Sequence, residues 1–159
     1  MGLVLRQATP SDAGLLLELI GELALYEREP AAVRTTAERL RAQLAQPEPP
    51  FECVIADWDG EPVGFALFFA TYSTWRGAPG IHLEDLFVRE RARRRGVGRA
   101  LLQHLARLVL RRGGARLEWA VLDWNAPALA FYRSLGAEAL NGWTTHRLSD
   151  GPLRALAEG

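Results

Sequence analysis

The chain has 159 residues, and its 19 basic residues, which are all arginine, balance its 19 acidic residues to a formal net charge of zero. The absence of lysine excludes enzymes that form a lysine imine with substrate or pyridoxal phosphate, and also nucleotidases whose phosphate loop requires a lysine. The length and the hydrophobic share of 48% predict one globular domain over residues 1–159.

The apolar runs and the cysteine content indicate a cytoplasmic protein. No apolar run reaches the ~18 residues that span a bilayer, and Met1–Arg6 lacks the regions of a secretory signal. Cys53 has no second cysteine to pair with and lies in a strand-like stretch, so we expect a packed thiol and not a nucleophile. The three histidines have no Cys or His at ligand spacing, so we expect no metal.

The first third of the chain predicts one strand and two helices. Leu3–Gln7 is typical of a strand, and Thr9–Asp12 is a helix-start signal before leucines at helical spacing, up to about Tyr26. Thr35 and Glu38 fit a capping box before a second helix, which ends at a proline-rich stretch.

The middle of the chain predicts three strands. Phe51–Asp57 and Pro62–Tyr72 flank the turn Asp59-Gly60, so we expect an antiparallel hairpin. The stretch Gly77–Gly80 breaks the chain, and Ile81–Val88 forms the next strand.

The last third predicts two helices and further strands. Gly96–Arg112 has one apolar stripe, Arg116–Leu122 is typical of a strand, and Asn125 caps a helix that runs to about Leu135. Short strands near Glu138–Leu140 and Trp143–Leu148 complete the sheet. The fold class is therefore α/β, with a mixed, mostly antiparallel sheet of six or seven strands flanked by about four helices.

An arginine-rich connection follows the strand that ends at Val88. Residues 89–99 contain six arginines and one acid, Glu90, although the chain as a whole is neutral. Gly96 and Gly98 allow a close approach of backbone to a ligand, and a helix N-terminus offers unpaired N–H groups. These features favour a cradle for one compact anion, such as a pyrophosphate.

Other interpretations of this loop remain open. A dinucleotide site would need a third glycine where Leu101 stands, and its glycines would directly follow the strand, although Asp123 resembles the ribose-binding acid of such sites. A basic patch for RNA and a merely solvated arginine face are further alternatives.

The spacing Arg93-x-x-Gly96-x-Gly98 resembles the signature of the GNAT superfamily of acyl-CoA-dependent N-acetyltransferases. The segment Asn125–Tyr132, followed by Leu135-Gly136, resembles a later segment of that family in the same order. A closer resemblance to the spermidine/spermine and thialysine acetyltransferase branch covers most of the chain and rests on Glu22–Glu27, Thr71–Trp75, Leu83–Val88, Trp124-Asn125 and Gly142-Trp143.

The resemblance implies acetyl-CoA as co-substrate and gives its contacts. The backbone of Leu86–Val88 would pair with the pantetheine arm, with the Leu86 N–H facing the thioester oxygen, and the N–H groups of Arg94–Arg99 would hold the pyrophosphate. The implied residues are Leu86, Phe87, Val88, Arg93, Arg94, Arg95, Gly96, Val97, Gly98, Arg99, Asn125 and Tyr132.

The chemistry requires an acid and a base. Tyr132 would donate a proton to the departing thiolate, since a phenol is neutral at pH 7, and Glu84 would take the proton of the amine, through a water. Tyr132 is otherwise a packing aromatic, and Glu84 a carboxylate paired with the arginine loop. Because Glu84 and Asp85 alternate along a strand, they should face opposite sides of the sheet.

The resemblance also implies an acceptor pocket and a homodimer. The pocket residues are Tyr26, Glu27, Trp75, Glu84, Asp85 and Trp143, with a second subunit contributing to the pocket. Ser73 and Asn141 replace acids of the polyamine pattern, which favours a smaller amine, a thialysine-like amino acid or a diamine, over a long polyamine. Transfer to a protein or peptide amine, and a non-catalytic module that binds acyl-CoA or RNA, are the alternatives; neither nucleic acid nor membrane is an expected partner.

Overall fold

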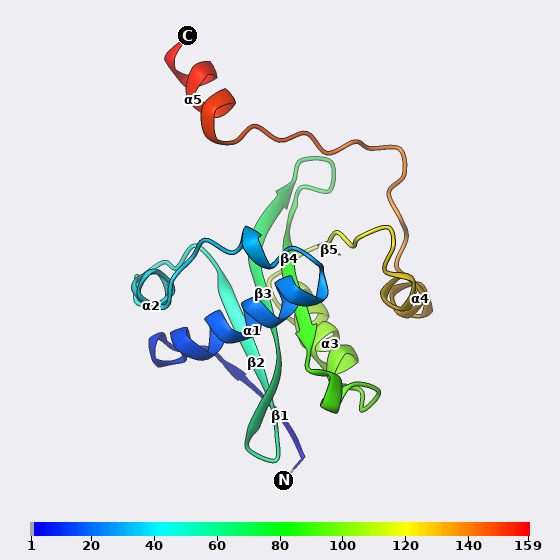
Figure 1. Ribbon diagram of the computed structural model, residues 1–159. Helices are drawn as coiled ribbons and strands as arrows, with labels where there is room; N and C mark the ends of the chain where they lie inside the picture. The colour runs from blue at the N-terminus through cyan, green and yellow to red at the C-terminus, as the bar shows by residue number, and fades with distance from the viewer. Residues whose placement is uncertain (1) are drawn as a thin grey trace. The chain divides into compact units, whose positions relative to one another are not determined.

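The computed structural model describes residues 2–159, which fall into two compact units (Figure 1). The first unit ends at Ala120, and the second runs from Val121 to Gly159. The single domain over residues 1–159 stays a prediction, and the two units are described separately.

The first unit contains a mixed sheet in the order β1-β2-β3-β4-β5. Its strands are β1 (Leu3–Gln7), β2 (Glu52–Trp58), β3 (Glu61–Ser73), β4 (Ala78–Val88) and β5 (Arg116–Glu118). The first four strands pair antiparallel, and β5 pairs parallel to β4. The predicted α/β class and mostly antiparallel sheet are confirmed, but six or seven strands is wrong, because the described residues form five.

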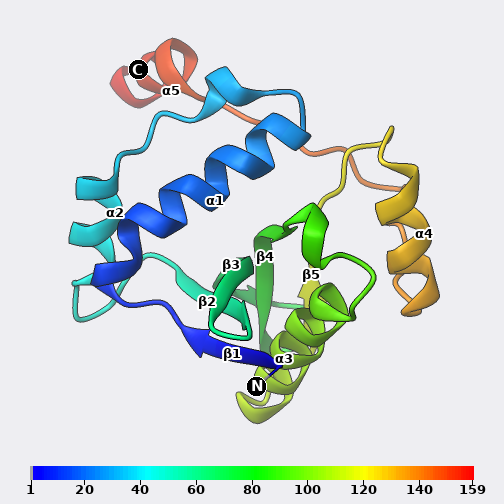
Figure 2. The same ribbon diagram turned by 60° about the horizontal axis from the view of Figure 1, so that its bottom comes forward.

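Helices cover both faces of this sheet, as the view in Figure 2 shows for α1 and α3. The α-helices of the unit are α1 (Ala13–Tyr26), α2 (Ala37–Leu44) and α3 (Val97–Arg111), and the 3₁₀ turns are η1 (Pro10–Asp12), η2 (Pro30–Ala32) and η3 (Glu90–Ala92). Leu16 and Leu19 of α1 are fully buried in one core with Ile55 and Phe65. The leucine spacing that predicts α1 is therefore the spacing of its buried face.

Two local predictions in this unit are wrong. The cap of α2 is Thr36 and not Thr35, since the Thr36 Oγ1 accepts the Arg39 N–H at 3.1 Å. The break predicted at Gly77–Gly80 is too long, since β4 already begins at Ala78. Pro79 lacks an N–H, but its carbonyl accepts the Ala115 N–H at 2.9 Å, so the strand continues through the proline.

The second unit holds α4 (Ala126–Ser134) and α5 (Asp150–Glu158). The strands predicted near Glu138–Leu140 and Trp143–Leu148 are wrong, because the structure describes no strand there. A strand needs a neighbour that accepts its ladder of hydrogen bonds, and the backbone bond here is a turn, from Trp143 N–H to the Leu140 carbonyl. Helix α5 was not predicted, and β5 ends at Glu118 instead of Leu122.

Candidate active site

The last residues of β4 form an open edge of the sheet. Strand β3 pairs with β4 from Ala78 to Val88, except at Glu84, but within the described residues β5 pairs only with Gly80, Ile81 and His82. Within the described residues no strand follows β4 on that side beyond His82. Unpaired N–H and C=O groups of such an edge are a template for an extended ligand. The edge includes Leu86–Val88, the residues that the family resemblance assigns to the pantetheine arm.

A glycine lies directly under this edge. Gly64 of β3 pairs with Val88, and a Cβ on Gly64 would lie 2.5 Å from the Phe87 carbonyl oxygen. No side chain fits there without moving the backbone of β4. Phe87 is 7% exposed and packs in the core beneath α1. The end of β4 is therefore held both by this core and by its close contact with β3.

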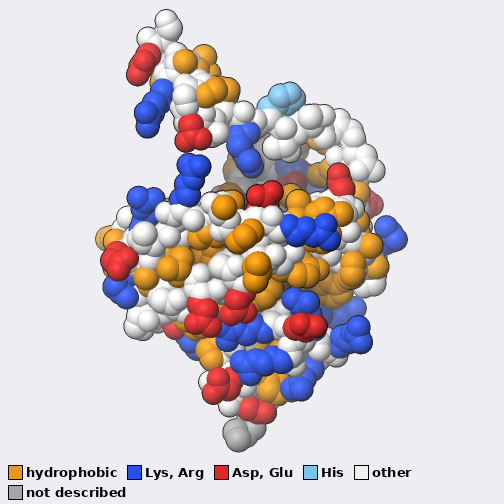
Figure 3. Space-filling view, viewed as in Figure 1, with side chains coloured by type: hydrophobic (Ala, Val, Ile, Leu, Met, Phe, Trp, Pro, Cys, Tyr) orange, Lys and Arg blue, Asp and Glu red, His pale blue; other side chains and the backbone are white. Residues whose placement is uncertain are grey.

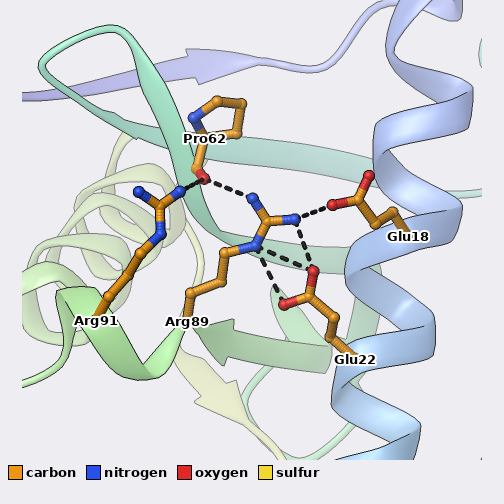
Figure 4. A network of polar contacts seen from close by, with 5 residues as sticks. All are labelled: Glu18, Glu22, Pro62, Arg89 and Arg91. Atoms are coloured by element: carbon orange, nitrogen blue, oxygen red, sulfur yellow. Dashed lines mark hydrogen bonds and ion pairs between the residues drawn. The ribbon is translucent and has the colours of Figure 1, made fainter.

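Arg89, the first residue after β4, anchors the end of the strand (Figure 4). Its guanidinium pairs with Glu18 and, at 2.6 Å, with Glu22, and it donates to the Pro62 carbonyl at 3.0 Å. Since both acids lie on α1, one side chain connects that helix with β3 and the end of β4. The carboxylates raise the pKa of Arg89 and make it unavailable as a phosphate ligand.

The loop after Arg89 has the backbone geometry of an anion site. Arg94 and Gly96 take left-handed conformations, with φ of 62° and 80°. Helix α3 begins at Val97, and its first intrahelical bond runs from the Ala100 N–H to the Gly96 carbonyl at 2.9 Å. The N–H groups before Ala100 therefore point out of the helix end, where a partial positive charge favours an anion.

The arginine side chains of this loop have separate tasks. The Arg93 guanidinium lies 5.0 Å from the centre of the Tyr26 ring, and the Arg95 guanidinium lies 5.3 Å from the centre of the Trp58 ring. Arg94 and Arg99 are exposed and make none of these contacts. Of the predicted phosphate-binding arginines, Arg94 and Arg99 therefore have side chains that are still available to a phosphate.

Three acids at the end of α1 and in β4 interact through their charges. Asp85 is half-buried, and burial, together with the charges of Glu84 and Glu27, raises its pKa to about 6. Burial also raises the pKa of Glu27, the residue that ends α1. Such a cluster of carboxylates suits a cation, since an ammonium group would relieve the repulsion among them. Charge interactions thus link Asp85 with Glu84 and Glu27, while the grouping of these acids with Tyr26 into an acceptor pocket stays a prediction.

Glu84 occupies a bulge in β4. Leu67 pairs with Asp85 and Phe68 pairs with Leu83, so Glu84 is the residue without a partner opposite it. Its carboxylate lies 3.5 Å from the His82 Nε2, and the His82 ring contacts Phe69. Bulges often redirect a side chain near a site, and this one separates the surroundings of Glu84 from those of Asp85.

Trp75 is not brought to the acids of its own chain. It lies in the turn between β3 and β4 and is 86% exposed. Asp85 is seven residues beyond the first residue of β4, Ala78, which corresponds to about 20 Å along an extended strand. Trp75 therefore meets an acceptor pocket at Asp85 only if another chain supplies it.

The remaining predicted residues lie in the second unit. Asn125 is 9% exposed, and its Oδ1 caps α4 by accepting the Ala128 N–H at 3.3 Å, as the sequence predicts. Tyr132 is half-buried on α4, with its ring centre 5.6 Å from that of Phe131. Trp143 is 73% exposed. Their roles toward the cofactor and the acceptor stay predictions.

Other chemistries find little support in the described residues. Cys53 is 1% exposed, and burial raises its pKa to about 12, so the packed thiol is confirmed. Among residues 2–159, no three His, Cys, Asp or Glu side chains gather to hold a metal ion, and no helix there is long and apolar enough to span a membrane. Acidic and basic side chains intermingle in the lower part of the face in Figure 3.

Sequence reasoning missed two residues of this site. Arg89 was counted as part of the cationic loop, although Glu18 and Glu22, one helical turn apart on α1, indicate a cation between them. Trp58, whose ring the Arg95 guanidinium stacks on, cannot be recognised from a sequence pattern, because the contact joins two segments that are far apart in the chain.

Comparison with known proteins agrees with this geometry. The model of the Acetyltransferase (GNAT) family matches residues 17–137. A thialysine N-epsilon-acetyltransferase from Bos taurus is 37% identical, over 97% of this chain and 96% of its own length. An L-ornithine N5-acetyltransferase from Arabidopsis thaliana is 29% identical, over 96% of this chain and 86% of its own.

A solved structure is similar over the whole chain. An integron cassette protein from Vibrio cholerae matches with a TM-score of 0.83 and 23% identity, covering 100% of this chain and 99% of that one. This likeness concerns the fold alone. The resemblance seen in the sequence is confirmed by the family model and by the near full-length relatives: the chain belongs to the GNAT family of acetyltransferases.

Proposed function

We propose that this enzyme transfers the acetyl group of acetyl-CoA to the primary amine of a small molecule, with a thialysine-like amino acid as the first candidate. The carrying observation is the anion cradle at the start of α3, in a chain whose Glu27 and Asp85 interact through their charges and whose Arg93 contacts Tyr26. The thialysine and ornithine enzymes named above act on amino acids with a side-chain amine, which supports the same class here.

The open edge and the cradle fit acetyl-CoA as co-substrate. The β4 edge at Leu86–Val88 has backbone groups for the amide-containing pantetheine arm. The N–H groups of residues 94–99 suit the pyrophosphate, aided by the side chains of Arg94 and Arg99. In this proposal Phe87 and Val97, which are buried, shape the site from below, and Asn125 contacts the coenzyme from the cap of α4.

The proposed reaction is a direct attack of the amine on the thioester carbonyl. Glu84 removes the amine proton through a water, the Leu86 N–H stabilises the carbonyl oxygen, and Tyr132 protonates the departing thiolate. The buried Cys53 and the absence of lysine are consistent with transfer that forms no acyl-enzyme.

The acceptor contacts point to a compact cation. Glu27 and Asp85 are placed to attract an ammonium group, and Tyr26 and Trp143 offer aromatic faces. Ser73 is 4% exposed, and its Oγ accepts the Arg76 N–H at 3.1 Å within the turn, so it adds no charge for a polyamine. We therefore rank thialysine and diamines above spermine.

The proposed enzyme works as a homodimer in the cytoplasm. Trp75 lies in the turn before Ala78, which is about 20 Å from Asp85 along β4, so its assignment to the acceptor pocket requires a second copy of the chain. Tyr72, at 67% exposed, adds apolar surface beside it. One buried thiol without a disulfide is compatible with a reducing compartment.

An acceptor screen tests the proposed function. Purified protein with acetyl-CoA is offered thialysine, ornithine, lysine, diamines, spermine and peptides, and thiol release is followed. We expect turnover on thialysine and diamines at a kcat/KM at least tenfold above that on spermine, because two anionic contacts are replaced by neutral residues. Acetyl-CoA at 100 times its Kd should stabilise the fold by ~2.7 kcal/mol. Transfer to peptides alone, or stabilisation by RNA and not acetyl-CoA, would contradict the proposal.

Replacing Tyr132 by phenylalanine tests the general acid. We expect Tyr132→Phe to lower kcat ~10²-fold with little change in the Kd of acetyl-CoA, since only proton donation is lost. Tyr72→Phe removes a hydroxyl from an exposed tyrosine of β3 and should leave kcat unchanged. Equal activity of the Tyr132→Phe variant and wild type would remove Tyr132 from the acid role.

Substitutions of the adjacent acids Glu84 and Asp85 should affect different kinetic constants. Asp85→Asn should raise the acceptor KM at pH 8 about tenfold, the loss of one charge-assisted hydrogen bond, with a smaller effect on kcat. Because Asp85 has a pKa of about 6, the wild-type KM should rise as the pH falls below 6, and this rise should vanish in Asp85→Asn.

Glu84→Gln should lower kcat and alter its pH profile; an unaltered profile would exclude Glu84 as the base.

The Asp85 substitution should also affect stability. A raised carboxyl pKa means that the protonated form favours the fold: this contribution is complete below pH 3.8 and is lost as the pH rises through about 6. Asp85→Asn should therefore be more stable than wild type at pH 8, by about 1–2 kcal/mol, and the gain should shrink toward pH 4. Denaturant unfolding at both pH values measures this, and a loss of stability at pH 8 would contradict the assigned electrostatics.

A further inference from the structure

Arg93 makes contacts that a phosphate ligand would not need. Its guanidinium lies 5.0 Å from the centre of the Tyr26 ring and 5.8 Å from the centre of the Phe87 ring, within the range of cation–π attraction. Its Nε donates to the Val88 carbonyl at 2.8 Å. The side chain is thus turned back toward β4 and α1.

These partners belong to the two halves of the proposed reaction centre. Phe87 and Val88 end the strand whose edge we assign to the pantetheine arm, and Arg93 opens the segment that we assign to the pyrophosphate. Tyr26 is the last residue of α1, directly before Glu27, whose charge reaches Asp85. One side chain therefore contacts elements of both the coenzyme site and the acceptor site.

The chemistry of arginine suits this position. A planar guanidinium stacks on aromatic faces while an N–H in its plane donates to a carbonyl, whereas an ammonium group is a single hydrated point charge. Tyr26 is 37% exposed and is the last residue of α1, so its ring lies at the surface where the Arg93 guanidinium stacks on it. The contact with Arg93 restricts that ring while Val88 restricts the arginine.

We propose that Arg93 is a positioning residue that couples the two substrate sites. It holds the Tyr26 ring against the end of β4, so that the ring is in place for the amine when acetyl-CoA fixes the backbone of residues 93–99. The proposal rests on the proposed function. It divides the arginines of the loop into Arg93, which acts on the acceptor side, and Arg94 and Arg99, which face the phosphates.

A double-mutant cycle tests the coupling. Wild type, Arg93→Gln, Tyr26→Leu and the double variant are compared for kcat, the KM of thialysine and the Kd of acetyl-CoA. We expect each single substitution to raise the thialysine KM about fivefold, the upper end for an exposed cation–π contact, and the double variant to be no worse than either. In Arg93→Gln, the Kd of acetyl-CoA should change by a smaller factor than the thialysine KM.

Two further variants sharpen this test. Arg91→Gln, in the same loop, removes a charge that, within the described residues, donates to the Pro62 carbonyl at 3.4 Å, and should leave the thialysine KM unchanged. Arg93→Lys should restore less than half of the lost affinity, since it lacks the planar fork.

Three outcomes would overturn the coupling. These are independent effects of the two substitutions on KM, a tenfold loss of acetyl-CoA affinity in Arg93→Gln with an unchanged thialysine KM, and full rescue by Arg93→Lys. If the wild-type protein acetylates no amine, the proposed function is wrong. Equilibrium unfolding of the same four proteins then still tests the contact between Arg93 and Tyr26. Additive unfolding free energies would then exclude it.

Discussion

The end of strand β4 depends on the ion pairs of Arg89. Its guanidinium joins Glu18 and Glu22 of α1 and the Pro62 carbonyl of β3 at the point where the strand leaves the sheet. Removing the arginine would leave the Glu18 and Glu22 carboxylates of α1 without the cation that joins them to the end of β4. The open edge of β4 ends at Arg89, and the arginine loop and the start of α3 come directly after it in the chain. Their positions therefore depend on how Arg89 is held.

Two arginines near the end of β4 make contacts that a lysine could not make. Arg89 makes hydrogen bonds to three partners, and Arg93 stacks on two rings while donating to a carbonyl, which requires a planar guanidinium. The positive charges of Arg89 and Arg93 are thus used in contacts within the chain. The candidate anion site depends on backbone conformation, through the left-handed residues Arg94 and Gly96 and the first turn of α3. A neutral protein can therefore offer such a site.

Sequence patterns predicted the elements that carry a regular signal. The leucine stripes of α1 and α3, the turn at Asp59-Gly60 and the Arg93–Gly98 spacing each follow from a local periodicity or motif, and each element stands where expected. The errors arise where tertiary contacts decide. Strand β4 extends through Pro79 because Ala115 supplies a partner, and the segment around Leu140 forms no strand because no ladder partner is present. The bulge at Glu84 and the stacking of Arg93 likewise depend on distant segments.

In the proposed function, the backbone of the loop after β4, more than its many arginine side chains, holds the phosphates of the acetyl donor. Hydrogen exchange of the backbone amides, measured with and without saturating acetyl-CoA, tests this most directly. We predict that exchange of the amides of residues 94–99 and of Leu86–Val88 slows at least tenfold on binding, while exchange of the amides of β1 and β2 is unchanged. Unchanged exchange across residues 94–99 in the saturated protein would show that this backbone does not hold the phosphates.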